Sequence, residues 1–274
     1  MENPPPKLNP ADERMVEENV GLNSKMIFEV IRREGEEELE RPKRSLIWSG
    51  VAAGVMISLS VLGEAIFRTY LPEAEWAYLV ENLGYSLGFL VVILGKMQLF
   101  TENTITTVVP VVHNPSRRMF RQVGSLWTIV LAANVVGAFA VALLFAYTSA
   151  IPAELKPAIE ELSRHATGFP AMEAFQRGIP AGVLVAAIVW LLPESEGSKF
   201  FVIVVFTWLI AAGDFTHVVA GSVEMAYLMV QGLLTPLDGL LQFFLPVLAG
   251  NIVGGTVIFT LLAFGQVRDE LDET

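Results

Sequence analysis

The sequence contains no cysteine among its 274 residues. Disulfides, thiolate metal sites and thiol nucleophiles are therefore excluded. Histidine is scarce too, and the three histidines (113, 165 and 217) are too far apart in the sequence to indicate a ligand cluster. No nucleotide-binding loop or nucleophile–base arrangement can be found either. We therefore expect no enzyme, no metal site and no cofactor.

Positive charge is also in short supply. Lys and Arg number 18 against 29 Asp and Glu, which gives a net charge of −11. No basic cluster is present, so we expect no nucleic-acid partner. The acids gather in terminal segments and loops, for example at residues 34–38, 160–161 and 269–273. The chain begins with a polar, proline-rich segment, and we expect no cleaved signal peptide.

Apolar residues, by contrast, make up 53% of the chain, which is too many for a soluble domain with a polar surface. A membrane-spanning helix needs about 20 mostly apolar residues. The second and fifth apolar segments are longer than a bilayer requires and contain polar breaks, so each is predicted to be two half-helices joined by a loop. The six predicted spans are residues 46–66, 77–110, 126–147, 177–192, 200–230 and 243–264.

These spans divide the chain into three parts. Residues 1–44 form a polar segment, residues 45–265 a transmembrane domain, and residues 266–274 an acidic tail. Residues 1–10 are predicted to be disordered, whereas apolar residues between positions 26 and 39 recur at helical spacing and predict an amphipathic helix. The basic residues at 43–44 and 117–121 flank the first three spans, which favours a cytoplasmic location for both termini.

Short motifs of the first half return in the second. Residues 131–137 (LAANVVG) match 248–254 (LAGNIVG), and Ala-Gly-Val occurs at 53–55 and 181–183. Phe-Thr followed by an ionisable residue occurs at 100–102 and 215–217, inside the two predicted breaks. Aligning these triplets makes Glu102 the repeat partner of His217. Interrupted segments at matching positions of two halves indicate a transport pathway near the middle of the membrane.

With these motifs the chain resembles the formate/nitrite transporter family. Residues 84–89 (GYSLGF), 99–101 (LFT), 177–179 (RGI), 215–217 (FTH) and 250–251 (GN) carry the resemblance. It is similar to a little-characterised branch of bacterial inner-membrane proteins with an acidic N-terminal extension. The resemblance implies an all-α, aquaporin-like six-helix protomer, built from two inverted three-helix repeats with broken second and fifth helices.

The same resemblance implies a multi-pass protein of the bacterial inner membrane that assembles as a homopentamer in the lipid bilayer, with one path per protomer. Family members move small monovalent anions such as formate, nitrite or hydrosulfide, often with a proton. By motif position, His217 matches the central pore histidine and Thr101 the neighbouring loop threonine. The two apolar constrictions would be formed by Tyr85, Phe89, Leu99, Phe100, Val185 and Ile210.

Two positions depart from the family pattern. Gly182 stands where the family usually has an asparagine that faces the histidine, so one group expected to orient an anion is missing. Glu102 stands where many relatives have a small residue, and an ionised carboxylate there would repel an anion. Both departures concern the substrate more than the fold.

The residues themselves support His217 as the strongest site candidate. Histidine exchanges a proton near physiological pH, and an anion that crosses with a proton avoids much of the cost of leaving water. The alternative is a structural histidine bonded to freed loop carbonyls.

Thr101 could contact the pore or cap the following half-helix. Glu102 could relay protons or set selectivity, or could pair with helix-end N–H groups or with Lys96.

The remaining polar residues of the spans have mostly structural interpretations. Asn134 and Asn251 are expected to satisfy backbone groups freed by the breaks, and Asp214 to pair with a nearby partner. Glu64 and Glu81 are expected to be solvated near span ends. Glu224 could face either a protomer interface or the pathway.

Three functions are compatible with these observations. The first is a proton-linked transporter or channel for a small monovalent anion. The second is a pore for a small neutral or cationic solute, which Glu102 and Gly182 would favour. The third is a non-conducting membrane scaffold or sensor that signals through the acidic N-terminal segment. Charge selectivity separates the first two, and absence of any flux would favour the third.

Overall fold

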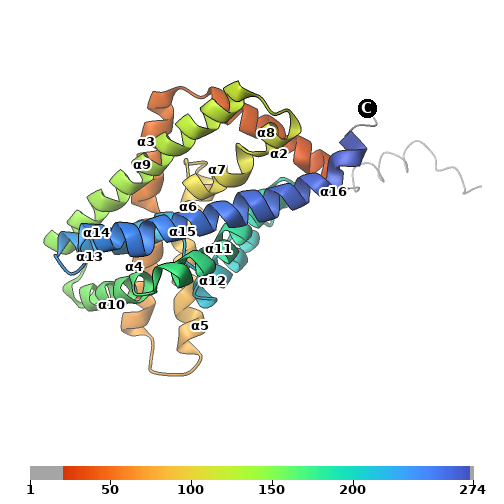
Figure 1. The fold of residues 1–274 in the computed structure, drawn as a ribbon. Coiled ribbons are helices and arrows are strands. Elements are labelled where there is room, and N and C mark those ends of the chain that lie inside the picture. Colours follow the sequence, from red (N-terminus) through yellow and green to blue (C-terminus); the bar gives the residue numbers. More distant parts are fainter. Residues whose placement is uncertain (1–20, 272–274) are drawn as a thin grey trace, which may run out of the picture.

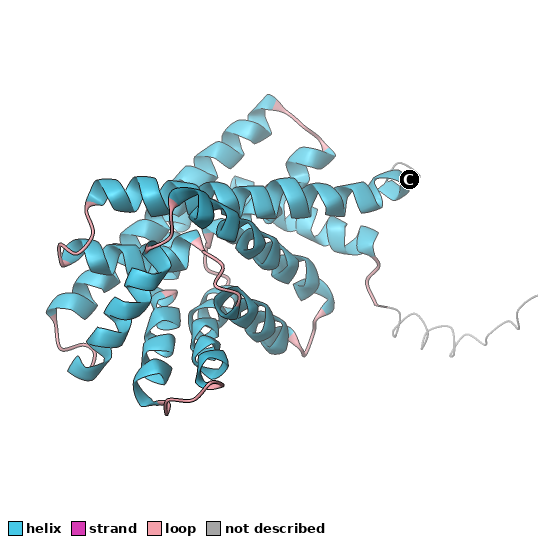
Figure 2. Ribbon diagram, turned by 60° about the horizontal axis from the view of Figure 1, so that its bottom comes forward, coloured by secondary structure: helices cyan, strands magenta, loops and turns pink. Residues whose placement is uncertain are grey.

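The computed structural model describes residues 21–271, and within this range the chain consists of helices and connecting loops (Figures 1 and 2). The predicted disorder of residues 1–10 lies outside the described residues, as does the end of the acidic tail. Among the described residues, five helices are long and apolar enough to cross a membrane, and two shorter apolar helices, Lys199–Ala212 and Val218–Val230, form a sixth, broken span.

The first half of the molecule supplies three spans. Helix α2 precedes them, α3 and α4 form the first span, the broken second span runs from α5 to α8, and α9 is the third. The bounds are α2 Ser24–Glu40, α3 Lys43–Met56, α4 Ser58–Tyr70, α5 Ala77–Glu81, η1 Asn82–Tyr85, α6 Ser86–Leu94, α7 Phe100–Thr106, α8 Val109–His113 and α9 Arg117–Tyr147.

The second half repeats this plan after a connecting segment. That segment lies between the predicted spans 126–147 and 177–192, where we expect a loop, but it contains the amphipathic helix α10, which packs against α4 and α13. The bounds are η2 Ala153–Leu155, α10 Lys156–Thr167, α11 Ala171–Leu191, η3 Leu192–Glu194, α12 Lys199–Ala212, α13 Val218–Val230, α14 Pro236–Asp238, η4 Gly239–Phe244, α15 Leu245–Ile252, η5 Val253–Thr260 and α16 Leu261–Leu271. The segments η4 and η5 are π-helical turns within the last span.

Helix α2 lies against one end of the bundle, beside α8 and α16 (Figure 1). The Asn23 side chain caps it by accepting a 2.9 Å hydrogen bond from the Met26 N–H. Its apolar face, with Phe28 fully buried, packs against Phe264. On the polar face, the Arg32 guanidinium holds the pKa of the Glu29 carboxyl at about 2 through hydrogen bonding.

The two breaks have the same backbone geometry. Lys96 and Asp214 are the non-glycine residues with positive φ among the described residues, at 49° and 56°. Three residues further on, Leu99 and His217 are the extended N-cap residues of α7 and α13. The structural repeat partner of His217 is therefore Leu99. The register that paired Glu102 with His217 is wrong by three residues.

Close helix contacts at glycine follow the corrected register. A Cβ added at Gly54 would lie 2.1 Å from the Asn134 carbonyl oxygen, and one added at Gly182 would lie 2.3 Å from that of Asn251. Neither position can hold a side chain without moving a backbone. The repeated Ala-Gly-Val motif thus marks the crossing of α3 with α9 and, equivalently, of α11 with α15.

Candidate functional site: the junction of the two broken helices

The first break is fastened by Asn134 of α9. Its Oδ1 accepts a 3.0 Å hydrogen bond from the Phe100 N–H, and its Nδ2 donates to the carbonyl oxygens of Gly50 and Gln98, each at 2.8 Å. The amide therefore uses both of its N–H donors and one of the two lone pairs of its oxygen. The side chain is fully buried and replaces the backbone partners that the interrupted helix has lost.

Asn251 does the same at the second break. Its Oδ1 accepts a 2.8 Å bond from the Val218 N–H, and its Nδ2 donates to the carbonyl oxygens of Gly178 and Thr216 at 2.8 and 2.9 Å. The Thr216 hydroxyl donates to the Ala174 carbonyl instead of capping α13. Each loop is thus held by one asparagine from the span that follows it.

His217 and Thr101 join the two breaks. The His217 Nε2 lies 2.8 Å from the Thr101 Oγ1, and the His217 Nδ1 accepts a 3.2 Å hydrogen bond from the Ala220 N–H at the start of α13. Since Nδ1 is an acceptor, the neutral ring carries its proton on Nε2 and donates it to Thr101. The Thr101 hydroxyl hydrogen is then not used in this contact.

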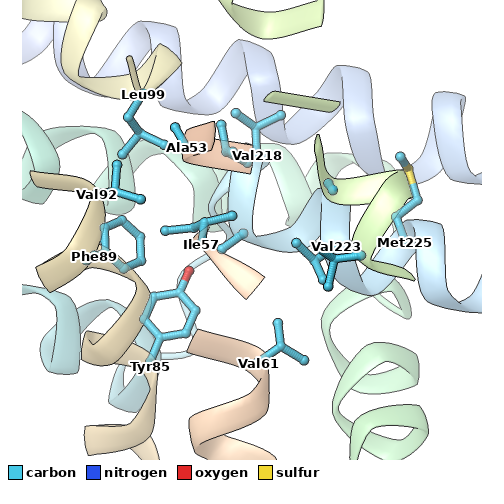
Figure 3. Close-up of a cluster of buried hydrophobic side chains, with 14 of the residues drawn as sticks. Ala53, Ile57, Val61, Tyr85, Phe89, Val92, Leu99, Val218, Val223 and Met225 are labelled. Carbon is cyan, nitrogen blue, oxygen red and sulfur yellow. The ribbon is translucent and has the colours of Figure 1, made fainter. Parts of the chain in front are cut away.

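Aromatic side chains form a wall next to this pair. The Phe89 ring meets the His217 imidazole edge to face, with centroids 5.0 Å apart, and the Tyr85 ring lies 5.1 Å beyond Phe89. Tyr85 and Phe89 lie one above the other, with Ile57 opposite and Val92 and Leu99 further along (Figure 3). The Tyr85 and Phe89 rings thus form an apolar wall beside the His217 imidazole.

The other residues expected at the constrictions are buried as well. Leu99, Val185 and Ile210 are fully buried within the same apolar core as Phe89. Phe100 is buried too, and its ring packs edge to face on Trp127 of α9, with centroids 5.5 Å apart. Phe100 therefore contacts α9, the helix whose Asn134 fastens the first break.

A cavity of about 470 Å³ opens next to His217, and we call it the acidic vestibule. Its walls come from α4, the segment from α5 to η1, α10, the second break and α13. Glu64 and Glu81 belong to this wall and are only 6% and 9% exposed, so the expectation that they are solvated is wrong. The carboxylates that line the vestibule are Glu64, Glu81, Glu161, Asp214 and Glu224.

Ion pairs close the rim of this vestibule. Asp214 bonds Arg177 through its Oδ2 at 2.9 Å and His165 through its Oδ1 at 2.9 Å. Arg177 also donates to the Asp214 backbone carbonyl at 3.1 Å, which supports the positive φ at that residue. Sequence reasoning missed this cluster, because His165 lies on α10, a helix that was expected to be a loop.

A second cavity of about 310 Å³ lies under α2, next to the first break, and we call it the α2-side cavity. Leu99, Glu102 and Lys96 line it together with acids of α2. Glu102 and Lys96 form no ion pair with each other in the structure. Instead, α2 is tied to the first break by Glu38, which accepts a 2.7 Å hydrogen bond from the Gln98 Nε2.

Gly182 lines neither cavity. Its Cα faces the Asn251 backbone, and an asparagine side chain at this position would meet that backbone first. The structure therefore brings together His217, Thr101, Phe89 and Tyr85. It places Glu102 and Lys96 in the α2-side cavity and Gly182 in a helix crossing.

The fold and the junction define a class of protein: a channel-like membrane protein whose two inverted repeats meet at two broken helices. Solved structures share this fold. A "pentameric formate channel with formate bound" has a TM-score of 0.72 at 19% identity, over 82% of this chain and 97% of that one. An "FNT family ion channel" has a TM-score of 0.73 at 20% identity, over 89% and 98%.

Within that class, the chain belongs to the formate/nitrite transporter family, whose model matches residues 25–265. It is 40% identical over 255 residues to the inner membrane protein YfdC of Escherichia coli strain K12, covering 93% of this chain and 82% of that protein. It is 26% identical over 248 residues to the formate channel FocA of Haemophilus influenzae, covering 80% and 84%. The predicted family and fold class are confirmed, and the chain is a transport protein rather than an enzyme.

Proposed function

We propose that the protein passes a small monovalent weak-acid anion, of the formate or nitrite type, together with a proton. The observation that carries this proposal is the 2.8 Å contact between His217 and Thr101, which joins the two breaks between two cavities. An N–H and an O–H donor at an apolar passage suit a small anion or its neutral acid. The relatives that are named formate channels support the same class of substrate.

Proton linkage follows from the apolar wall. An isolated anion cannot cross the Phe89 and Leu99 region without losing most of its hydration, which costs several kcal/mol or more. A proton added to the anion removes that cost. His217 can give up a proton only after gaining one at Nδ1, because its Nε2 proton is the one already present. Proton uptake at His217 must therefore displace the Ala220 N–H from Nδ1.

We place the protein in the bacterial inner membrane as a homopentamer, with one path through each protomer. The pentameric neighbour and the inner-membrane relative support this assembly and location. The α2 side would face the cytoplasm, since the basic residues at 43–44 and 117–121 flank spans at that end. Because the chain has no cysteine, single cysteines placed in the 72–75 loop or at position 195 would report the orientation by labelling from one side.

One observation favours a second candidate function, a pore for a small cationic or neutral solute. Five carboxylates line the acidic vestibule, against two arginines and two histidines. Ionised carboxylates in a confined cavity attract cations and repel anions. Uptake of ammonium without uptake of any anion would establish this alternative.

The role of His217 is tested by replacing it in protein reconstituted into liposomes. His217→Ala should abolish the rise in formate uptake that occurs when the external pH falls, because the group that passes the proton is removed. His113→Ala makes the same chemical change at an exposed position on the α2 side and serves as the matched control. Unchanged pH dependence in His217→Ala would contradict the proposed role.

A further inference from the structure

Two buried carboxylates of the acidic vestibule have no partner. Glu64 of α4 is 6% exposed and Glu224 of α13 is 7% exposed. Neither makes a hydrogen bond or ion pair with any described residue, yet no fully enclosed side-chain oxygen in the described part of the chain lacks a hydrogen-bond partner. The oxygens of both carboxyl groups must therefore open onto the vestibule that both residues line.

The other charged groups around this cavity are already engaged. Within the described residues, Arg68 bonds Glu81 at 2.8 Å and Glu161 at 3.3 Å, Arg164 bonds Glu160 at 2.9 Å, and Asp214 is held by Arg177 and His165. The phenol groups nearby are those of Tyr78 and Tyr85. No free cation of the wall therefore neutralises Glu64 or Glu224.

The position of the pair connects it with the site. Helices α4 and α13 pack against each other, and Glu64 and Glu224 line the same vestibule as Tyr85, one ring of the aromatic wall. On α13, His217, Gly221 and Glu224 recur at i, i+4 and i+7, so they share one helix face toward the vestibule. The pair thus lies in the same cavity as the His217 ring.

We propose that Glu64 and Glu224 form the proton-loading site of the vestibule, which supplies the proton that His217 passes to the anion. Two buried carboxylates that line one confined cavity without a cation partner cannot both be ionised at low cost, so the pair keeps one proton between them. This inference rests on the proposed function and adds to it the source of the proton. It also explains why a vestibule rich in acids leads to a path for an anion.

The transfer balances in atoms and charge. The O–H bond of the protonated carboxyl breaks and an N–H bond forms at His217 Nδ1, which leaves one more carboxylate and an imidazolium. The carboxylate regains a proton from the solution that enters the vestibule, a polar cavity large enough for water to connect the groups. The imidazolium then gives its proton to the anion, and the neutral acid crosses the apolar region.

A bound metal ion is a poorer occupant of this place. The described residues contain no group of three or more His, Cys, Asp or Glu side chains arranged to hold a metal ion. The pair offers carboxyl groups from two helices, and the other acids of the vestibule are held in ion pairs, whereas hard cations take six or more oxygen ligands. A shared proton requires only the two carboxyl groups.

The test combines spectroscopy with flux on reconstituted protein. Infrared difference spectra at neutral pH should show the carbonyl band of a protonated carboxylic acid, and this band should be lost in a Glu64→Gln, Glu224→Gln double variant. The same variant should take up formate about a hundredfold more slowly, the lower end of the contribution of a positioned proton donor. Glu73→Gln, at an exposed loop carboxylate, is the control that changes neither result.

Several outcomes would overturn the proposal. Faster formate uptake in the double variant would show that the carboxylates only repel anions, and an unchanged carbonyl band would show that they hold no proton. The single variants Glu64→Asp and Glu224→Asp keep the acid and should retain most of the uptake, which separates proton supply from misfolding. If the native protein took up no formate while the band behaved as expected, the proposed function would fail and the shared proton would stand.

Discussion

The two buried asparagines are the residues on which the breaks depend most. Each donates to two carbonyl oxygens and accepts from one N–H, at distances of 2.8–3.0 Å. A leucine of similar size would remove all three hydrogen bonds, and each buried backbone group that is left without another partner costs about 1–3 kcal/mol. The asparagines thus allow an interrupted helix to exist within the membrane.

Asn134→Leu and Asn251→Leu should each destabilise the detergent-purified protein by about 3 kcal/mol or more, because three buried groups lose their partners. The measurement is thermal unfolding followed by light scattering and intrinsic fluorescence. Asn114→Leu, at an exposed position after α8, should leave the transition almost unchanged. Equal transitions in all three variants would show that the breaks do not depend on the amides.

His217 illustrates what the sequence could and could not predict about a single residue. Its motif and its apolar surroundings identified it, but the tautomer follows only from the Ala220 N–H that bonds Nδ1. Glu64 and Glu81 were expected at span ends in contact with water. They are buried because α10, whose helical character was not foreseen, covers them and completes a vestibule that is formed by distant segments.

At the scale of elements, the repeat determines how the helices cross. Asparagine and glycine motifs identified the repeated helices correctly, since Gly54 with Asn134 and Gly182 with Asn251 make equivalent contacts. The Phe-Thr triplets gave a false register. Short matches between apolar segments arise by chance, whereas the positive φ of Lys96 and Asp214 marks the equivalent backbone positions, and this geometry leaves little trace in residue type.

The corrected register changes the expectation for Gly182. An asparagine at this position cannot turn toward His217 without separating α11 from α15, because a Cβ would lie 2.3 Å from the Asn251 carbonyl oxygen. Gly182→Asn should therefore reduce the yield of folded protein and lower uptake, although it restores the side chain that the family usually has there. Size-exclusion chromatography followed by uptake assays would check this, with Gly124→Asn, which has open space around it, as the control.

The ion pairs on helix α2 do not contribute to the pH dependence expected of transport. The pKa of Glu29 is about 2 because Arg32 and Arg33 bind its ionised form, against an ordinary value of about 4.5. Because the pKa of Glu29 is lower in the folded protein, the ion pair stabilises the fold fully at pH values above about 4.5. This contribution is lost as the pH falls from about 4.5 through about 2. The Glu29–Arg32 pair thus stays ionised across the range in which histidine titrates.

The whole molecule is a pair of inverted repeats that meet at one junction between two unequal cavities. The vestibule is acidic and bounded by ion pairs, and the α2-side cavity is covered by a helix that Glu38 and Gln98 tie to the first break. Six spans with two breaks could be predicted from length, apolar runs and motifs. The difference between the two cavities could not be predicted, because α2 and α10 add different residues to the two ends of a symmetric core.

This architecture makes charge selectivity the central question. Reconstituted wild-type protein should be loaded into liposomes that contain a pH indicator and exposed in turn to formate, nitrite, ammonium and glycerol at acidic and alkaline external pH. We predict uptake of formate and nitrite that rises with acidity and carries about one proton per anion. Uptake of ammonium or glycerol alone would contradict proton-linked anion passage, and no uptake of any solute would favour the scaffold function.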